Sequence, residues 1–227
     1  MGRFNWREVR KHLDGGFTDI AAAVETGTLF GDSAHEMAQH FKEVHTVELN
    51  KQLYLRAIAR FVGTPVKVYF GNSAEVLAQL APRLAAPTIF YLDAHWSGDT
   101  STNWQQSNWK GYRKGTIDTA FVGDRPTPEA QVPLAEELRA IIAGCRHKCV
   151  IYIDDMDKFG DGGVGLKNKA FAGEDWSHLS VALLKNIVAP RLVDWDEVTV
   201  GEEKQLFITL RPAVKTAVFD IAVPLTH

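Results

Sequence analysis

The sequence predicts an α/β fold in which helices cover both faces of a doubly wound, mostly parallel sheet of seven strands. Stretches of strand length alternate with stretches of helical periodicity, and the connections are short, which favours parallel strands joined by crossover helices. The stretches TIFYL and VIYI are almost continuously apolar, as expected for strands buried on both faces. The last two strand-like stretches are separated by Gly201, Glu202 and Glu203, which predicts an antiparallel hairpin strand at the C-terminal end.

Each element is indicated by its own pattern. Residues 1–16 have apolar side chains at helical spacing and end in two glycines, which predicts a helical preface that covers the sheet or a pocket. The spacing of apolar residues, together with the turn residues between them, predicts strands at 20–25, 44–48, 66–70, 88–92, 149–153, 192–200 and 205–210. They predict helices at 33–41, 51–61, 74–84, 134–143 and 177–188. With no repeat and no linker, residues 1–227 are expected to form a single domain.

The composition excludes several classes of partner. The net charge is -3, with 25 Lys and Arg against 28 Asp and Glu and no block of like charge, so we expect neither nucleic acid nor a membrane surface as a partner. A small molecule fits better, and the N-terminal helix or the C-terminal tail could pair two copies as a homo-oligomer. No apolar leader or spanning run is present, and Cys145 and Cys149 fit a reduced pair better than a zinc site, so we expect a cytoplasmic protein.

Polar side chains stand where successive strands are predicted to end. Ligands of doubly wound sheets bind beyond these carboxyl ends, so the positions mark a candidate site. Carboxylates there could instead cap the following helices, and we favour that interpretation for Asp32. For Glu48 we favour hydrogen bonds to ribose hydroxyls, the common role of a carboxylate after the second strand. The strand-end residues are Glu25, Glu48, Asn72, Asp93, Asp154 and Asp155.

The stretch 21–33, AAAVETGTLFGDS, predicts a strand, a glycine turn and a helix start. It lacks the second early glycine of the G-x-G-x-x-G pattern, which brings backbone against a pyrophosphate. A cofactor with an adenosine and a zwitterionic tail fits better, because Glu25 suits an ammonium group and would repel a pyrophosphate.

Six segments, taken in order, carry a family resemblance. VETGTLFGDS, VELN, GNSAEVL, FYLDAHWSGDT, PLAEEL and VIYIDDMDKF together resemble class I S-adenosylmethionine-dependent methyltransferases, which have a Rossmann-like fold. Within that class the chain is similar to small bacterial proteins of the macrocin O-methyltransferase-like kind. The resemblance covers residues 20–210 and leaves the tail beyond Pro212 unassigned.

The resemblance implies a role for each matching residue. Glu25 and Gly27 would line the methionine moiety of S-adenosylmethionine, and Glu48 would hold the ribose hydroxyls. Asp93 would lie beneath the sulfonium and face the acceptor. Further polar contacts would come from Thr26, Thr28 and Ser33, while Asn72, where many relatives have Asp, and Ser73 would lie by the adenine.

Methyl transfer to a hydroxyl requires that the hydroxyl be oriented and its proton removed or masked. Asp93, Asp154 and Asp155 follow adjacent strands and could bind one Mg2+ ion, as metal-dependent relatives of the macrocin type do. Alternatively, one of Asp154 and Asp155 caps a turn while the other accepts backbone hydrogen bonds. His95 is a candidate base or substrate-binding residue, although a lone histidine is often structural. We therefore predict Asp93, His95 and Asp154 as catalytic residues.

Residues 95–133 are too long for an ordinary connection and predict a lid or substrate-binding insertion. Its aromatic and amide side chains suit a sugar-like, polyhydroxylated or aromatic acceptor, or else form a small core that pins the insertion to the sheet. The function expected overall is O-methylation of such an acceptor. The alternatives are a nucleotide- or nicotinamide-binding enzyme of the same fold and a non-catalytic module that binds S-adenosylmethionine.

Overall fold

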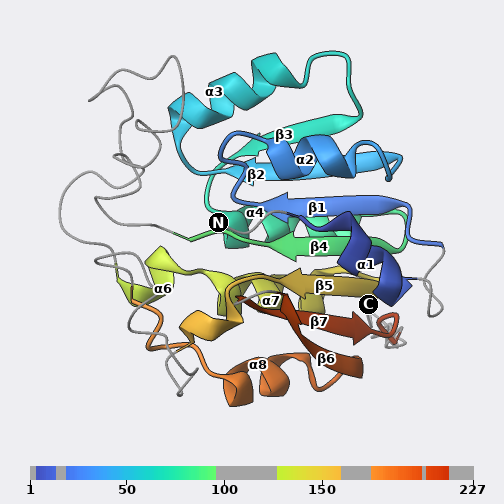
Figure 1. Cartoon of the computed structure of the whole chain (residues 1–227), viewed down its shortest axis with the longest axis vertical. Coiled ribbons are helices and arrows are strands. Elements are labelled where there is room, and N and C mark those ends of the chain that lie inside the picture. The colour runs from blue at the N-terminus through green and yellow to red at the C-terminus, as the bar shows by residue number, and fades with distance from the viewer. Residues whose placement is uncertain (1–3, 14–18, 96–126, 160–174, 201–202, 215–227) are drawn as a thin grey trace, which may run out of the picture.

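The computed structural model describes residues 4–13, 19–95, 127–159, 175–200 and 203–214. Its strands form one seven-stranded sheet in the order β3-β2-β1-β4-β5-β7-β6 (Figure 1). The predicted α/β fold is confirmed. The strands are β1 (Ala22–Thr26), β2 (Glu43–Glu48), β3 (Val66–Phe70), β4 (Thr88–Leu92), β5 (Cys149–Ile153), β6 (Leu192–Val200) and β7 (Glu203–Leu210).

Five strands are parallel and two are not. β1 pairs in parallel with β2 and β4, β2 with β3, and β4 with β5, whereas β7 runs antiparallel to both β5 and β6. The predicted C-terminal hairpin is therefore present, with β7 inserted between β5 and β6. The carboxyl ends of all five parallel strands meet at one edge of the sheet, as the sequence predicts.

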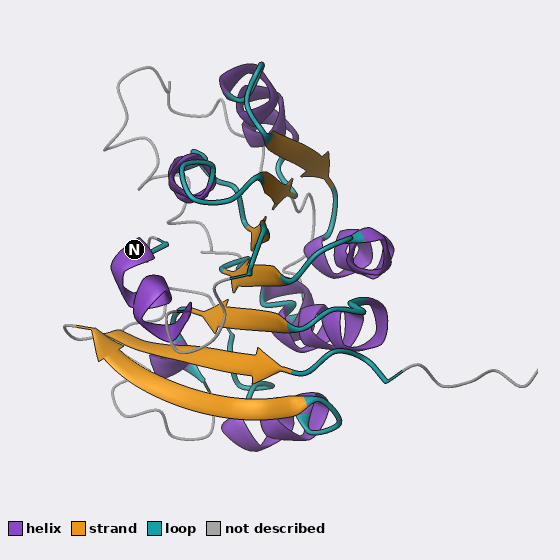
Figure 2. Cartoon of the chain, turned by 90° about the vertical axis from the view of Figure 1, so that its right-hand side faces the viewer, coloured by secondary structure: helices purple, strands orange, loops and turns teal. Residues whose placement is uncertain are grey.

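Helices cover both faces of the sheet, as Figure 2 shows. Alternation along each strand explains the two layers, because successive side chains point to opposite faces. Val24, Phe90 and Ile151 of the strands pack with Leu77 and Leu138 of the helices in one core. The apolar residues next to these three in the strands pack in a second core on the opposite face. The helices are α1 (Trp6–Leu13), α2 (Asp32–Met37), α3 (Lys51–Arg60), α4 (Ser73–Leu80), α6 (Pro128–Gln131), α7 (Leu134–Gly144) and α8 (Val181–Val188).

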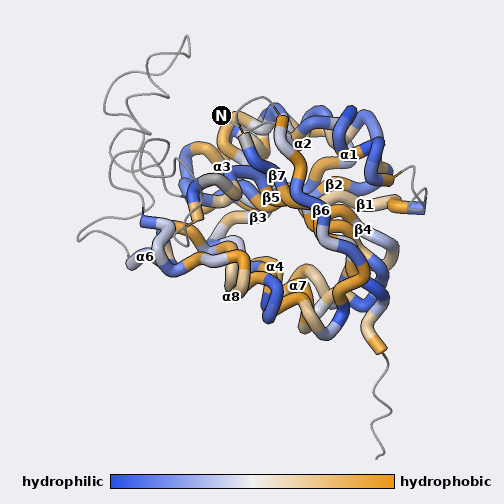
Figure 3. Tube along the Cα trace, turned by 60° about the horizontal axis from the view of Figure 1, so that its bottom comes forward, coloured by the Kyte–Doolittle hydropathy of each residue, from blue (hydrophilic) through white to orange (hydrophobic). Residues whose placement is uncertain are grey.

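The predicted N-terminal preface is the helix α1, which lies on the face of α2 and α3. Phe4, just before it, is buried and makes edge contacts with the ring of Tyr91, 5.8 Å between centroids. The ring of His12 stacks on Phe207 of β7 at 3.8 Å. Figure 3 shows how the hydrophobic stretches gather along the strands at the centre of the molecule. No helix in the described ranges has the length and hydropathy needed to cross a membrane.

Several predicted boundaries are corrected by local chemistry. The prediction that Asp32 caps α2 is wrong, because Gly31 occupies the cap with a left-handed backbone and Asp32 is the first helical residue, ion-paired with Arg60 at 2.8 Å. The predicted helix 74–84 is divided into α4 and a 3-10 turn, Ala81–Arg83, that contains Pro82, which has no backbone N–H to donate. The predicted helix 177–188 begins later, at Val181, where the Ser180 side chain accepts a hydrogen bond from the Leu183 N–H.

Candidate functional site

The turn after β1 is packed against the segment that follows β4. Gly27 has a φ of 83°, and a Cβ built there would lie 2.8 Å from the backbone oxygen of Asp93. Its N–H donates to the Val47 carbonyl at 3.0 Å, which fixes the turn to β2 as well. A glycine is therefore needed here for contact between two loops.

Glu25 is a buried carboxyl at the end of β1. Its Oε2 accepts a 2.6 Å hydrogen bond from the Thr46 hydroxyl, and Thr46 Oγ1 lies 2.6 Å from Thr28 Oγ1. The pKa of Glu25 is raised to about 8, chiefly by burial and also by the charges of Asp93 and Glu48, while the hydrogen bonds from the Thr46 and Ser33 hydroxyls oppose the rise. Ser33 Oγ also accepts a hydrogen bond from the Phe4 N–H at 3.3 Å, so the N-terminal segment reaches this part of the site.

Glu48 connects the end of β2 to the turn after β1. Its two oxygens accept hydrogen bonds from the N–H groups of Asn50 and Leu29, each at 2.8 Å, and Leu29 has the left-handed φ of 50°. Burial raises the pKa of Glu48 to about 7. The cap of α3 is Asn50, whose side chain accepts from Gln52 and Leu53, so Glu48 does not cap that helix through its side chain.

Asn72 and Ser73 lie where β3 passes into α4. The Asn72 side chain caps α4 by accepting hydrogen bonds from the N–H groups of Ala74 and Glu75 at 3.0 and 3.3 Å. Ser73 is buried at the first position of the helix. Asn72, which follows β3, is thus a helix cap. This is the alternative role that the sequence left open for the carboxylates at the other strand ends.

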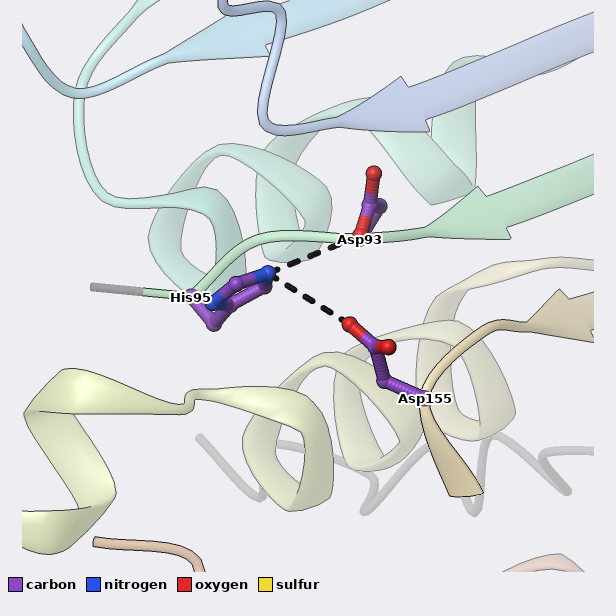
Figure 4. A group of neighbouring side chains, drawn as sticks. All are labelled: Asp93, His95 and Asp155. Carbon is purple, nitrogen blue, oxygen red and sulfur yellow. Dashed lines mark ion pairs between the residues drawn. The ribbon is translucent and has the colours of Figure 1, made fainter. Parts of the chain in front are cut away.

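Asp93, His95 and Asp155 converge at the ends of β4 and β5 (Figure 4). The Nε2 atom of His95 lies 3.8 Å from Asp93 Oδ1 and 3.6 Å from Asp155 Oδ2. One potential ligand atom from each residue lies within 4.8 Å of the others. Asp155 has a left-handed backbone, φ 62°, and its Oδ2 also forms a 2.8 Å ion pair with the Lys158 Nζ. The structure therefore brings three predicted site residues together.

Asp154 lines the same pocket as this group but is not one of its members. Its Oδ1 accepts hydrogen bonds from the Asp155 N–H at 3.0 Å and from Gln205 Nε2 at 3.4 Å. The hydroxyl of Tyr91 lies 3.4 Å from Asp154 Oδ2 and 3.2 Å from Asp93 Oδ2. Of the predicted metal ligands, Asp93 and Asp155 thus share a group, whereas Asp154 is hydrogen-bonded within the protein.

The two converging carboxyl groups differ in charge state. Burial raises the pKa of Asp93 to about 8, with Asp155 and Asp154 adding to the effect and His95 opposing it. Burial also raises the pKa of Asp155, but His95 and Lys158 outweigh it and the net shift is downward. At neutral pH Asp155 is therefore the ionised member of the pair and Asp93 is largely protonated.

A small pocket opens beside this group, and sequence reasoning missed two residues that line it, Glu137 of α7 and Trp176. Trp176 packs near the His95 ring, 5.5 Å between centroids, and Lys158 Nζ lies 5.3 Å from the centre of the Trp176 ring. Glu137 had a signal in the sequence, because it falls on the same helical face as Leu134, Leu138 and Ile141. Of the predicted insertion 95–133, residues 96–126 lie outside the described residues.

Several solved structures with a similar fold are described as methyltransferases. The chain resembles the S-adenosylmethionine-bound amino pentose methyltransferase CalS10 of Micromonospora echinaspora, with 13% identity, 90% of this chain and 89% of the other covered, and a TM-score of 0.52. An S-adenosylmethionine-dependent methyltransferase of Anabaena variabilis is 10% identical, with 92% of this chain and 85% of the other covered and a TM-score of 0.52. The N-methyltransferase NodS of Bradyrhizobium japonicum, in complex with S-adenosylhomocysteine, is also 10% identical, with 92% of this chain and 85% of the other covered and a TM-score of 0.50. No protein-family model matches the sequence, and the search of curated proteins found no match. The chain therefore has the class I methyltransferase fold, as predicted.

Proposed function

We propose that this protein is an S-adenosylmethionine-dependent methyltransferase that methylates an oxygen of a small sugar-like, polyhydroxylated or aromatic acceptor in the cytoplasm. The observation that carries the proposal is the pair of buried carboxyl groups, Glu25 and Glu48, on neighbouring strand ends of a methyltransferase fold. Two such groups side by side suit a cofactor that presents an ammonium and a pair of ribose hydroxyls. The likeness to structures crystallised with S-adenosylmethionine or its product supports the choice of cofactor.

The proposed cofactor contacts follow the edge of the sheet. Glu25 would bind the ammonium of the methionine moiety, and Glu48 would accept hydrogen bonds from the ribose. Asn72 and Ser73 would flank the adenine, and Asp93 would lie beneath the sulfonium. The turn formed by Thr26, Gly27 and Thr28, with Ser33 at the start of α2, would enclose the methionine moiety.

A divalent cation fits the group beside the pocket. Mg2+ in proteins is commonly held by one or two carboxylates, with water and substrate oxygens completing the octahedron. Asp93 and Asp155 supply two such carboxylates, and Asp154 would orient Asp155 through the bond to its N–H. When bound, the ion would lower the pKa of the acceptor hydroxyl.

We assign to His95 the role of the base that accepts the proton of the acceptor hydroxyl. The cofactor, held by Glu25 and Glu48, would supply an activated methyl group that passes from its sulfur to the acceptor oxygen, and His95 would take up the hydroxyl proton. The carboxylate of Asp155 faces His95 Nε2 and would stabilise the imidazolium, and Asp93 would add to this once a bound cation had displaced its proton. The pKa of Asp93 is raised in the ligand-free protein, and a cation bound beside it would lower that pKa and favour loss of the proton.

Calorimetry tests the proposal. The protein should bind S-adenosylmethionine and S-adenosylhomocysteine with one site each, and NAD+ should not compete. Mg2+ added to the complex should bind, and the variant Asp155→Asn should lose that signal while keeping the cofactor. Binding of NAD+ in place of S-adenosylmethionine would show that the cofactor is a dinucleotide.

A further inference from the structure

Glu137, in the first turns of α7, is the deepest carboxyl group of the pocket that also holds Asp93, His95 and Asp155. It is 1% exposed, whereas the side chains of the other three are between 13% and 19% exposed and lie nearer the solvent. Among the described residues its Oε1 has no hydrogen-bond partner. A buried acceptor without a partner is costly to the folded protein, so a ligand group that supplied an O–H or N–H would be bound favourably.

The carboxyl group of Glu137 is held in place by its neighbours. The hydroxyls of Ser73 and Thr26 hydrogen-bond it, and Thr26 Oγ1 also accepts a hydrogen bond from the Asp93 N–H at 3.3 Å. Glu137 is thereby connected to the chain segment that carries Asp93 and His95. Its free oxygen has a fixed position relative to the place where the acceptor reacts.

The pocket admits only a small group of suitable charge. The space open to the centre of a water-sized sphere is about 10 Å³, which suits one hydroxyl. No lysine or arginine of the described residues lines it, and Lys158, which lies over the Trp176 ring in its wall, is already ion-paired with Asp155 at 2.8 Å. A carboxylate or phosphate of the acceptor would find no positive partner there, whereas a hydroxyl can donate to Glu137 in either protonation state.

The reacting oxygen and Oε1 of Glu137 need different groups of the acceptor. The oxygen that receives the methyl group must stand beside His95, nearer the solvent, where the proton is taken up and the methyl donor can reach it. Oε1 is buried more deeply, so the group that reaches it is a second one on the same molecule. The narrow space keeps this second group close to the first.

We propose that Glu137 selects the acceptor, with its Oε1 accepting a hydrogen bond from a second hydroxyl next to the one that is methylated. The inference rests on the proposed function and narrows its substrate class to acceptors with two neighbouring hydroxyls, as in a sugar or another polyol. An acceptor with a single hydroxyl would leave Oε1 unpaired and be bound more weakly.

Cyclohexane probes separate the second hydroxyl from the first. Cyclohexane-1,2-diol in its cis form carries both hydroxyls, cyclohexanol lacks the second, and cis-2-methoxycyclohexanol replaces it by an ether that cannot donate. The NMR signal of the Trp176 indole N–H, assigned with Trp176→Phe, reports the three affinities with and without saturating S-adenosylhomocysteine. The wild type should bind the diol about tenfold more tightly than either of the other probes.

Substitutions at Glu137 separate recognition from support. Glu137→Gln keeps an oxygen that can accept the bond and should keep the preference for the diol to within about threefold, whereas Glu137→Met removes the acceptor and should reduce the preference to less than about twofold. Glu136→Gln is the matched control, because Glu136 is exposed on the same helix and pairs with Arg139, and it should keep the wild-type ratio. Each variant should keep the wild-type affinity for S-adenosylhomocysteine. Thermal unfolding shows whether each is folded, and Glu137→Leu replaces Glu137→Met if the latter is not.

Equal affinities of the wild type for the diol and cyclohexanol, or a preference kept by Glu137→Met, would overturn the inference. A loss of affinity for S-adenosylhomocysteine in Glu137→Met with the diol preference unchanged would also overturn it, because the residue would then act on the cofactor. The proposed function fails separately. A wild type that binds no S-adenosylhomocysteine but prefers the diol through Glu137 would keep the site for the second hydroxyl and lose the methyl donor.

Discussion

The hydroxyl of Tyr91 donates a hydrogen bond to Asp93, 3.2 Å from its Oδ2 atom. Tyr91 is fully buried in β4, with the ring of Phe4 against it, so its hydroxyl is held in place beneath the strand ends. The same hydroxyl lies 3.4 Å from Asp154, which makes Tyr91 the side chain shared by the two carboxyl groups. The polar site is thus anchored in the core of the sheet.

We expect Tyr91→Phe to move the pH profile of methyl transfer upward. The hydrogen bond from Tyr91 lowers the pKa of Asp93, so its loss should raise that pKa above about 8. The free energy of unfolding should fall by about 1 kcal/mol. Tyr69→Phe is the control, because Tyr69 bonds His45 away from the site and should change stability without moving the profile. An unchanged profile for Tyr91→Phe would contradict the role assigned to Asp93.

The ligand-free protein should become less stable as the pH rises. Burial raises the pKa of Glu25 to about 8 and of Glu48 to about 7, so the folded chain keeps protons that the unfolded chain has released. The free energy of unfolding should therefore be highest below about pH 5 with respect to these groups and fall up to about pH 8. Urea unfolding at several pH values measures this, and Glu25→Gln should flatten the curve. The same change at exposed Glu75 should not, and an equal slope in both variants would refute the prediction.

Asp155 and Asp154 should respond differently to the same substitution. Asn tolerates the left-handed backbone of Asp155, so Asp155→Asn removes charge without backbone strain and should abolish stimulation of the reaction by Mg2+. Asp154→Asn should raise the Mg2+ concentration needed for half-maximal rate by about tenfold to a hundredfold, as loss of a group that orients a ligand does. Asp194→Asn, on the exposed part of β6, serves as control. Full activity of Asp155→Asn without added metal would exclude the cation from the mechanism.

Alanine substitutions at Gly27 and Gly63 distinguish the effect of the contact between two loops from the effect of backbone strain. Gly27→Ala should lower the free energy of unfolding by about 2–4 kcal/mol, because it combines a positive φ with a Cβ 2.8 Å from the Asp93 carbonyl. Gly63 has nearly the same φ, 76°, but no atom of the described residues lies within 4 Å of a Cβ built there, so Gly63→Ala should cost only about 1–2 kcal/mol. Chemical denaturation gives both values. Equal losses would mean that the contact between the two loops contributes nothing.

The fold and the edge that carries the site could be predicted because parallel strands must end together. That rule fixes where Glu25, Glu48 and Asp93 lie once the strands are known. It does not distinguish Asp154 from Asp155. The two are adjacent in sequence, and the left-handed backbone of Asp155 and the bonds from Tyr91 and Gln205 decide which one faces His95.

Other features depended on contacts between distant segments. The need for Gly27 comes from the chain after β4, and the burial of Glu137 accompanies the packing of α7 on α4, neither of which is local in sequence. By residue type Asp32 is the better cap, yet Gly31 occupies that position, where a Cβ would lie 2.8 Å from the ring of Phe61. The predicted role of residues 95–133 as a substrate-binding insertion stays a prediction.

A crystal structure of the protein with S-adenosylhomocysteine tests the central claim most directly. We expect the ammonium within hydrogen-bond distance of Glu25, the ribose hydroxyls on Glu48 and the adenine beside Asn72 and Ser73. A cofactor bound elsewhere, or an ammonium turned away from Glu25 with the carboxyl still protonated, would contradict the proposed site.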